Sequence, residues 1–337
     1  MRMEPSDLQK RFDVAVVVPT TLRGSLFRAV ASVFDQDFRG RIQVLIGIDV
    51  PAGDPEVLQR LAARCPDNCS ITAMDFGYST SVAHGGVYPN RYSGALRTIL
   101  SYAANSPYVA YLDDDDWWHP EHLTSLLAAI EGKDWAYSLR WFADAETGWP
   151  ICEDEWDSLG PGKGINAEKF GGFVSTSNFL LNKHACHFVL PYWALSPFQD
   201  GTGEDRLVFA ALLKLEKTGG ASNRHTCFYS IPSHVQRHEH HQTQFAARKI
   251  EWIYDRTLVA ELASLEAEFL EAYRREDFAA AESLILRTLG INANSAAALE
   301  VHGLMCAASG DVERADTFRL RAYALKGNSS AFAGILQ

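Results

Sequence analysis

The chain has 337 residues, of which 47% are hydrophobic and 22% charged, as in globular proteins rather than disordered or fibrous ones. This length suits one large α/β domain and a smaller attachment. The net charge of −11 argues against a nucleic-acid-binding protein, which would need a basic surface, although a metal could still mediate contact with a nucleotide.

The cysteines and the N-terminal segment bear on the compartment. No Cys-x-x-Cys pair occurs among the six cysteines, which disfavours a zinc knuckle or a thioredoxin-type site. Residues 1–13 are polar and lack the apolar core of a signal peptide, and no run reaches the ~18 apolar residues of a membrane span. We therefore expect reduced thiols and a cytoplasmic protein. Peripheral attachment to the inner face of the membrane stays open.

The first part of the chain has the pattern of a βαβ unit. Phe12–Pro19 is a β-branched run that predicts a central parallel strand, residues 26–34 have helical spacing, and Ile42–Asp49 predicts a second buried strand that ends on a carboxylate. Such a unit is expected to be right-handed. Further along we expect a helix over 56–64, a strand over 70–76, a long loop over 77–93 and a helix over 94–104.

An acidic run follows the next predicted strand. Tyr108–Leu112 is apolar, Asp113–Asp116 are four adjacent carboxylates, and Pro120 is placed to open a helix over 121–130. A solvated acidic turn is the usual fate of such a run. Here the buried-looking strand and two tryptophans flank the run, and a divalent cation would offset the repulsion between its charges. We favour the metal interpretation because ligands bind at the carboxyl ends of strands in open α/β sheets.

The run Tyr-Leu-Asp-x-Asp-Asp-x-Trp-x-Pro-x-x-Leu, which starts at Tyr111, resembles the DXD region of inverting glycosyltransferases of family 2. Two earlier stretches, Val-Val-Pro-Thr ending at Thr20 and Ser-Val-Phe-x-Gln starting at Ser32, strengthen the resemblance, which covers roughly residues 12–245. It implies an α/β GT-A fold, a Rossmann-like mixed sheet flanked by helices that binds nucleoside-diphosphate sugars.

The resemblance implies a set of nucleotide-binding residues. Pro19, Thr20 and Arg23 would lie near the base, and Asp49 would hydrogen-bond the uracil or ribose. The family usually continues with Asp-Asp-Gly-Ser, whereas Val-Pro-Ala-Gly-Asp follows Asp49 here, and a helix or turn cap is the alternative for this carboxylate. Arg97 matches the arginine of the family's Ala-Arg-Asn and would steady the base or diphosphate. Its alternative is a surface ion pair.

The acidic run would supply the rest of the donor site. By the resemblance Asp113 would orient the ribose or the metal shell, with Asp114 beside the nucleotide, and Asp115 would coordinate Mn²⁺ or Mg²⁺, with Asp116 a second candidate ligand. In related enzymes a histidine closes this site, and His238, in Arg-His-x-x-x-x-Thr, is the nearest match. A mere surface histidine cluster is the alternative.

The acceptor side follows later in the chain. We expect a strand over 134–142, a loop over 144–172 and a strand over 173–181 that, by the resemblance, lines the acceptor cleft. Two glycines precede Glu204-Asp205, and an apolar helix follows, so the plain interpretation is a helix N-cap. The resemblance instead identifies Asp205 as the general base, with Glu204 as its neighbour and alternative.

From about residue 250 the composition shifts to Ala, Leu, Glu and Arg at helical spacing. Asp277-Phe-Ala-Ala-Ala-Glu matches Asp311-Val-Glu-Arg-Ala-Asp at an offset of about 34 residues, the tetratricopeptide period. We therefore expect domains at 1–249 and 250–337, the second a tetratricopeptide-like pair. Its expected role is protein contact, through dimerisation or docking of a protein acceptor.

The sequence thus predicts a metal-dependent inverting glycosyltransferase. The donor would be a nucleoside-diphosphate sugar, UDP-linked by the resemblance, and the acceptor a hydroxyl of a glycan, lipid-linked or protein substrate. A sugar nucleotidyltransferase is one alternative, disfavoured because no Gly-rich basic loop follows the first strand. The other is a non-catalytic scaffold with a degenerate transferase domain.

Overall fold

The computed structural model describes residues 11–91, 93–145, 148, 150–231, 239–250, 256–292 and 294–325. The chain divides into two compact units, Met1–Arg140 with Asp154–Cys227, and Trp141–Glu153 with Phe228–Gln337. Two of the three points of division fall inside strands, after Arg140 in Trp135–Asp144 (β6) and after Cys227 in Gly219–Ile231 (β11). The domain boundary that we placed between residues 249 and 250 stays a prediction.

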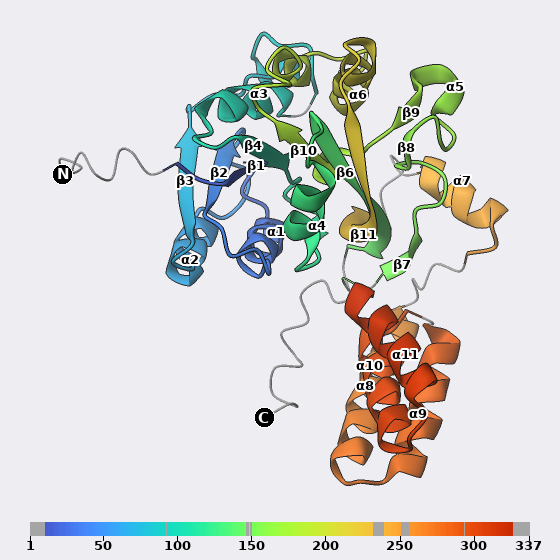
Figure 1. The fold of residues 1–337 in the computed structure, drawn as a ribbon. Helices are drawn as coiled ribbons and strands as arrows, with labels where there is room; N and C mark the ends of the chain where they lie inside the picture. The colour runs from blue at the N-terminus through green and yellow to red at the C-terminus, as the bar shows by residue number, and fades with distance from the viewer. Residues whose placement is uncertain are drawn as a thin grey trace. The chain divides into compact units, whose positions relative to one another are not determined.

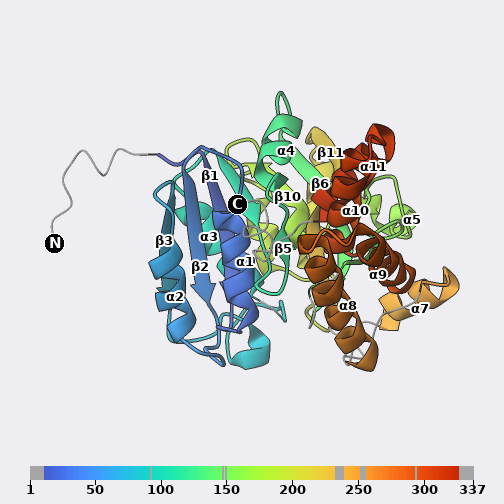
Figure 2. The same cartoon turned by 90° about the horizontal axis from the view of Figure 1, so that it is seen from below.

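The first unit is an α/β layer structure around one mixed sheet (Figures 1 and 2). Its strands, besides β6 and β11, are β1 (Val14–Thr20), β2 (Ile42–Ile48), β3 (Cys69–Asp75), β4 (Tyr108–Tyr111), β5 (Trp117–Trp118) and β10 (Phe179–Asn182). They lie in the order β3-β2-β1-β4-β10-β6-β11-β5, with β3, β2, β1 and β4 parallel and β10 antiparallel to β4 and β6. A separate small sheet joins β8 (Gly160–Pro161) and β9 (Gly172–Phe173).

Helices cover both faces of this sheet. They are α1 (Ser25–Phe34), α2 (Glu56–Arg64), α3 (Gly94–Ala103), α4 (His122–Ala129) and α6 (Glu204–Lys214), while the short helix α5 (Ala167–Phe170) lies beside β9. Strand β1 shows how the two cores form, because successive side chains of a strand point to opposite faces. Val16 packs with the apolar residues of α1, α2 and α4, whereas Val17 packs with those of α3 and α6.

This mixed sheet flanked by helices, followed by an all-helical region, confirms the predicted fold class. The βαβ unit and the helix after the acidic run are present, each within two residues of the predicted bounds. The strand predicted over 173–181 is wrong in part, because a 3₁₀ turn at Thr176–Asn178 separates β9 from β10. There the small polar side chains bond to residues far along the chain instead: Ser177 donates to Asp116, and Asn178 donates from Nδ2 to the carbonyls of Ser138 and Leu139. Strand β11 was not expected.

A buried ion cluster shapes the loop that leads to β8. Arg140 donates from Nε to Asp154 at 2.8 Å and from Nη2 to Asp157 at 2.6 Å, and all three side chains are buried. Three backbone N–H groups also donate to Asp154. Although burial acts to raise it, Arg140 and these N–H groups hold the pKa of Asp154 below its ordinary value. The loop is thus fixed by charge rather than by apolar packing.

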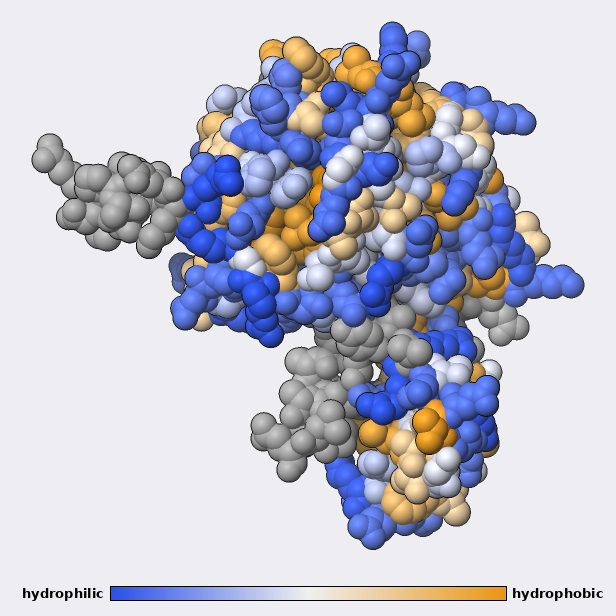
Figure 3. All heavy atoms as spheres, viewed as in Figure 1, coloured by the Kyte–Doolittle hydropathy of each residue, from blue (hydrophilic) through white to orange (hydrophobic). Residues whose placement is uncertain are grey.

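The second unit contains β7 (Pro150–Glu153), α7 (Glu239–Ala247) and four further helices, α8 (Arg256–Arg274), α9 (Phe278–Ile291), α10 (Ala296–Ala308) and α11 (Val312–Leu325). A small core of Phe269, Ile285, Ala298 and Val301 joins α8, α9 and α10. On the face seen in Figure 3 the surface of these helices carries both hydrophilic and apolar residues. Within the described residues, no helix is long and apolar enough to cross a membrane.

We expect Arg140→Met to lower the free energy of unfolding by about 3–5 kcal/mol, because it leaves two buried carboxylates without a cation. Arg64→Met is the matched control, since Arg64 pairs with Asp35 at the surface, where loss of an ion pair costs about 1 kcal/mol or less. Urea unfolding of both variants measures the difference. Equal losses would contradict a structural role for the buried cluster.

Candidate functional site

The predicted donor-site residues follow the carboxyl ends of three neighbouring parallel strands. Thr20 ends β1, Asp49 follows β2, and Asp113–Asp116 follow β4. The backbone N–H of Asp49 donates to the carbonyl of Thr20 at 2.9 Å, which ties the first two strand ends together. The sheet therefore brings residues from three distant parts of the chain to one edge, where ligands bind in open α/β sheets.

Asp114 is the best-satisfied carboxylate of the acidic run. The hydroxyl of Thr20 donates to its Oδ2 at 2.6 Å, and Arg23 forms an ion pair with its Oδ1. Arg23 also donates from Nη1 to Asp115 at 3.1 Å. Burial acts to lower the pKa of Arg23, but Asp115 and Asp114 raise it above its ordinary value. The turn after β1 thus supplies the cation that holds two neighbouring aspartates together.

Arg97 joins the acidic run to the Gly-Glu-Asp corner. From α3 it donates from Nη2 to Asp113 at 2.5 Å and from Nη1 to Glu204 at 2.9 Å. Arg97 is only 5% exposed. It does form ion pairs, but they are buried, so the alternative of a surface ion pair is wrong. The guanidinium also lies 5.6 Å from the ring centroid of Trp193.

Ser177 is a site residue that our sequence analysis missed. Its hydroxyl donates to Asp116 at 2.6 Å and accepts from the backbone N–H of Asp113 at 3.1 Å. Its carbonyl accepts from the indole of Trp118 at 2.8 Å. The signal was the Ser-Thr-Ser-Asn run, but these partners lie about sixty residues away, so only the fold identifies them.

The acidic run offers two accessible carboxylates for a cation. The side chains of Asp113 and Asp115 are 27% and 30% exposed, whereas Asp114 and Asp116 are buried and hydrogen-bonded inside the protein. Across the described ranges, no group of three or more metal-binding side chains occurs. Mg²⁺ is often held by one or two carboxylates and completed by phosphates and water, so this donor set fits a cation that binds with a nucleotide.

Glu204 and Asp205 open α6 but do not cap it. The cap position is Gly203, in a left-handed conformation at φ 83°, and no side-chain cap bond forms there, so the N-cap interpretation is wrong. Burial raises the pKa of Glu204 even though Arg97 acts to lower it. Burial and the charge of Glu204 raise the pKa of Asp205 to about 7. Within the described residues no cation forms an ion pair with Asp205, which can therefore take up a proton near neutral pH.

Asp49 keeps one carboxylate oxygen unused. Ser93 donates to its Oδ2 at 3.2 Å, while Oδ1 is buried without a hydrogen-bond partner among the described residues. No helix cap involves this carboxylate, which disfavours the cap alternative. A buried acceptor without a donor is rare in proteins, and a ligand hydroxyl or N–H would satisfy it.

Two further predicted residues remain, Pro19 and His238. Pro19 is buried within β1 opposite Gly47, so its place is in the sheet. His238 lies outside the described residues. Pro19 is thus part of the strand, whereas the contribution of His238 stays a prediction.

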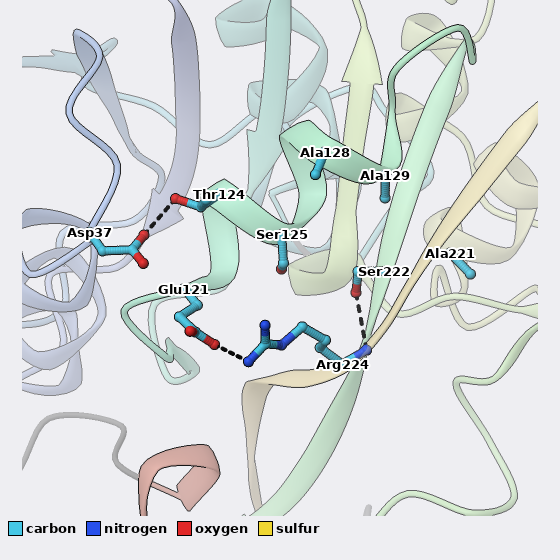
Figure 4. Close-up of a pocket in the computed structure, with 9 residues that line it drawn as sticks. All are labelled: Asp37, Glu121, Thr124, Ser125, Ala128, Ala129, Ala221, Ser222 and Arg224. Atoms are coloured by element: carbon cyan, nitrogen blue, oxygen red, sulfur yellow. Dashed lines mark hydrogen bonds and ion pairs between the residues drawn. The ribbon is translucent and has the colours of Figure 1, made fainter. Parts of the chain in front are cut away.

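A separate cavity of about 420 Å³ lies at α4 and the start of β11. None of the predicted site residues lines it. Figure 4 shows that its charged side chains already have partners: Arg224 pairs with Glu121, and Thr124 donates to Asp37. Its charged side chains are therefore already paired with one another or with a neighbouring hydroxyl.

Comparison with known structures gives low sequence identity. A crystal structure of S. aureus TarS 1–349 in complex with UDP-GlcNAc is 14% identical, covers 91% of this chain and 90% of its own, and has a TM-score of 0.48. The mannosyltransferase PcManGT from Pyrobaculum calidifontis, in complex with GDP-Man and Mn²⁺, is 13% identical, covers 98% and 89%, and has a TM-score of 0.46. Comparison with curated proteins finds no match.

The sequence match to a family is more direct. Residues 86–183 match the model of the family described as Glycosyl transferase family 2. The matched segment contains Arg97, the acidic run Asp113–Asp116 and Ser177, which are contacts of the site described above. The predicted resemblance to this family is confirmed over that segment, residues 86–183.

Proposed function

We propose that the protein is a metal-dependent inverting glycosyltransferase that moves a sugar from a nucleoside-diphosphate donor, by resemblance a UDP-sugar, to a hydroxyl of an acceptor. The bridge from Asp113 through Arg97 to Glu204 carries the proposal. One guanidinium thus contacts both Asp113, in the proposed donor site, and Glu204, in the carboxylate pair at the start of α6. A single-displacement enzyme needs such proximity between its leaving-group site and its base.

On the donor side, Asp113 and Asp115 would hold Mn²⁺ or Mg²⁺. The cation, when bound, offsets the negative charge that develops on the departing nucleoside diphosphate. Asp116 is a weaker candidate ligand, because its carboxylate is buried and accepts the hydroxyl of Ser177. Asp49, with its unused Oδ1, would accept a hydrogen bond from the uracil or ribose.

On the acceptor side, Asp205 would act as the general base. Its carboxylate takes the proton of the acceptor hydroxyl, and the hydroxyl oxygen then forms a bond to the anomeric carbon while the bond from that carbon to the diphosphate oxygen breaks. Attack from the face opposite the leaving group inverts the anomeric configuration. Glu204 fits a supporting role better, because its carboxylate already pairs with Arg97.

The helical unit fits a pair of tetratricopeptide-like repeats. Helix α11 begins and ends about 34 residues after α9, the period of that repeat. Asp277 and Asp311 accept the equivalent N–H groups, from Ala280 and Arg314, at the two helix starts. Two repeats are fewer than the roughly three that stand alone, so we infer a role in protein contact, with a second copy or a protein acceptor.

Asp115→Ala should weaken Mn²⁺-dependent binding of the donor by about 10- to 100-fold, because it removes one of the two exposed carboxylates. A thermal-shift panel of nucleotide sugars, with and without Mn²⁺, first identifies the donor, and calorimetry then compares the variants. Asp54→Ala, which removes an exposed carboxylate outside the site, is the control. Unchanged donor affinity in Asp115→Ala would refute the metal assignment, and the absence of any stabilising nucleotide sugar would refute the function.

Asp205→Asn should keep donor affinity but lower turnover by about 10²- to 10⁴-fold, because it removes only the base. In the unaltered enzyme, kcat/KM should rise with pH up to about 7, since Asp205 is protonated and inactive below its raised pKa. Glu204→Gln should move this acid limb to lower pH, because the charge of Glu204 is one cause of the raised pKa. A limb that stays in place in Glu204→Gln would assign it to another group.

A further inference from the structure

Arg206, the residue after the proposed base, lies among three aromatic rings. Its guanidinium carbon is 5.5 Å from the ring centroid of Phe170, 5.1 Å from that of Phe173 and 5.8 Å from that of Phe198. These rings come from α5, β9 and the segment before the Gly-Glu-Asp corner. Its backbone N–H donates to Asp205 at 2.9 Å, and its charge acts to lower the pKa of that carboxyl. Arg206 therefore belongs to the immediate surroundings of the base.

A second cation shares two of these rings. The ammonium nitrogen of Lys169 lies 5.1 Å from the ring centroid of Phe170 and 5.4 Å from that of Phe198. The two rings pack edge to face, with centroids 6.2 Å apart. One pair of phenylalanines thus contacts both positive charges.

Neither cation has an anionic partner in the part of the chain that the structure describes. Arg206 and Lys169 form no ion pair there, and Nε of Arg206 is buried without an acceptor. Contact with a ring face does not use the N–H groups of a cation, so these donors stay available. Other arginines near the site, Arg23 and Arg97, are already bonded to the acidic run. Two cations without an ion pair among the described residues are therefore available to an external anion.

We propose that Arg206 and Lys169 bind an anionic group of the acceptor, a phosphate ester or a carboxylate close to the hydroxyl that is glycosylated. This rests on the proposed function, in which Asp205 takes the proton of that hydroxyl. An anionic acceptor is repelled by Glu204, Asp205 and the acidic run, and the two cations offset this repulsion on the acceptor side. The phenylalanines hold them without an ion pair in the described ranges, so a guanidinium fork and an ammonium stay available to oxygen ligands.

Binding can be tested without knowledge of the donor. Ligand-observed NMR titrations of the full chain would use glycerol 3-phosphate and glucuronic acid as anionic probes, with glycerol and glucose as their neutral counterparts. We expect the unaltered protein to bind one anionic probe more tightly than its neutral counterpart. The identity of that probe shows whether the site takes a phosphate or a carboxylate. Lys169→Gln should weaken that binding about two- to fivefold, as the loss of one exposed ion pair does, and added salt should weaken it further.

The variants separate an anion site from a merely structural cluster. Arg206→Lys should retain more anion affinity than Arg206→Gln, because it keeps the charge. Lys214→Gln, at the opposite end of α6, makes the same charge change outside the cluster and should have no effect. Thermal shifts with UDP and Mn²⁺ report separately on the donor site. Equal binding of neutral and anionic probes, or full affinity in the Lys169→Gln, Arg206→Gln double variant, would overturn the proposal. If the unaltered protein bound an anionic probe but gave no thermal shift with UDP and Mn²⁺, that result would count against the proposed function and not against the anion site.

Discussion

The site depends on one buried cation, Arg97. Its guanidinium faces Asp113 on one side and Glu204 on the other, and little water reaches it. A guanidinium has its donors in a rigid fork, so the two carboxylates are held in a fixed relation to each other. Removal of the cation would leave two carboxylates uncompensated in a poorly hydrated place, which is the costly case for a buried ion pair. The link between the two halves of the site is therefore electrostatic, and it exists before any substrate binds.

The same bridge divides the carboxylates by role. Asp114 and Asp116 are buried and hydrogen-bonded, to Thr20 and Ser177, so they build the turn. Asp113 and Asp115 keep exposed surface on the edge where a nucleotide would lie. At the start of α6, Arg97 pairs with Glu204, whereas Asp205 has no ion pair within the described part of the chain. Burial and the neighbouring charge then raise the pKa of Asp205 toward neutrality, as an efficient general base requires.

Sequence reasoning predicted the parts of this site that have local signals. The β-branched runs, the acidic run and the glycines before Glu204 each occupy a short stretch, and their spacing fixes the element on which they lie. The partner of each carboxylate was not predictable. Arg97 and Glu204 are 107 residues apart and Ser177 and Asp116 are 61 apart, and only the sheet order brings them together. The Ser-Thr-Ser-Asn run likewise gives no local signal that it interrupts the strand predicted over 173–181.

The two sides of the site consist of different kinds of side chain, which bears on how acceptor specificity is set. The donor side uses carboxylates and hydroxyls at the ends of parallel strands, held by short bonds to Thr20, Arg23 and Ser177. The proposed base, Asp205, instead lies at the start of a helix, beside Arg206 in its phenylalanine cluster. Substitutions in that cluster would change what approaches Asp205 without touching a donor-side bond. Because the two halves meet at Arg97, acceptor preference can differ among such enzymes while the leaving-group site stays the same.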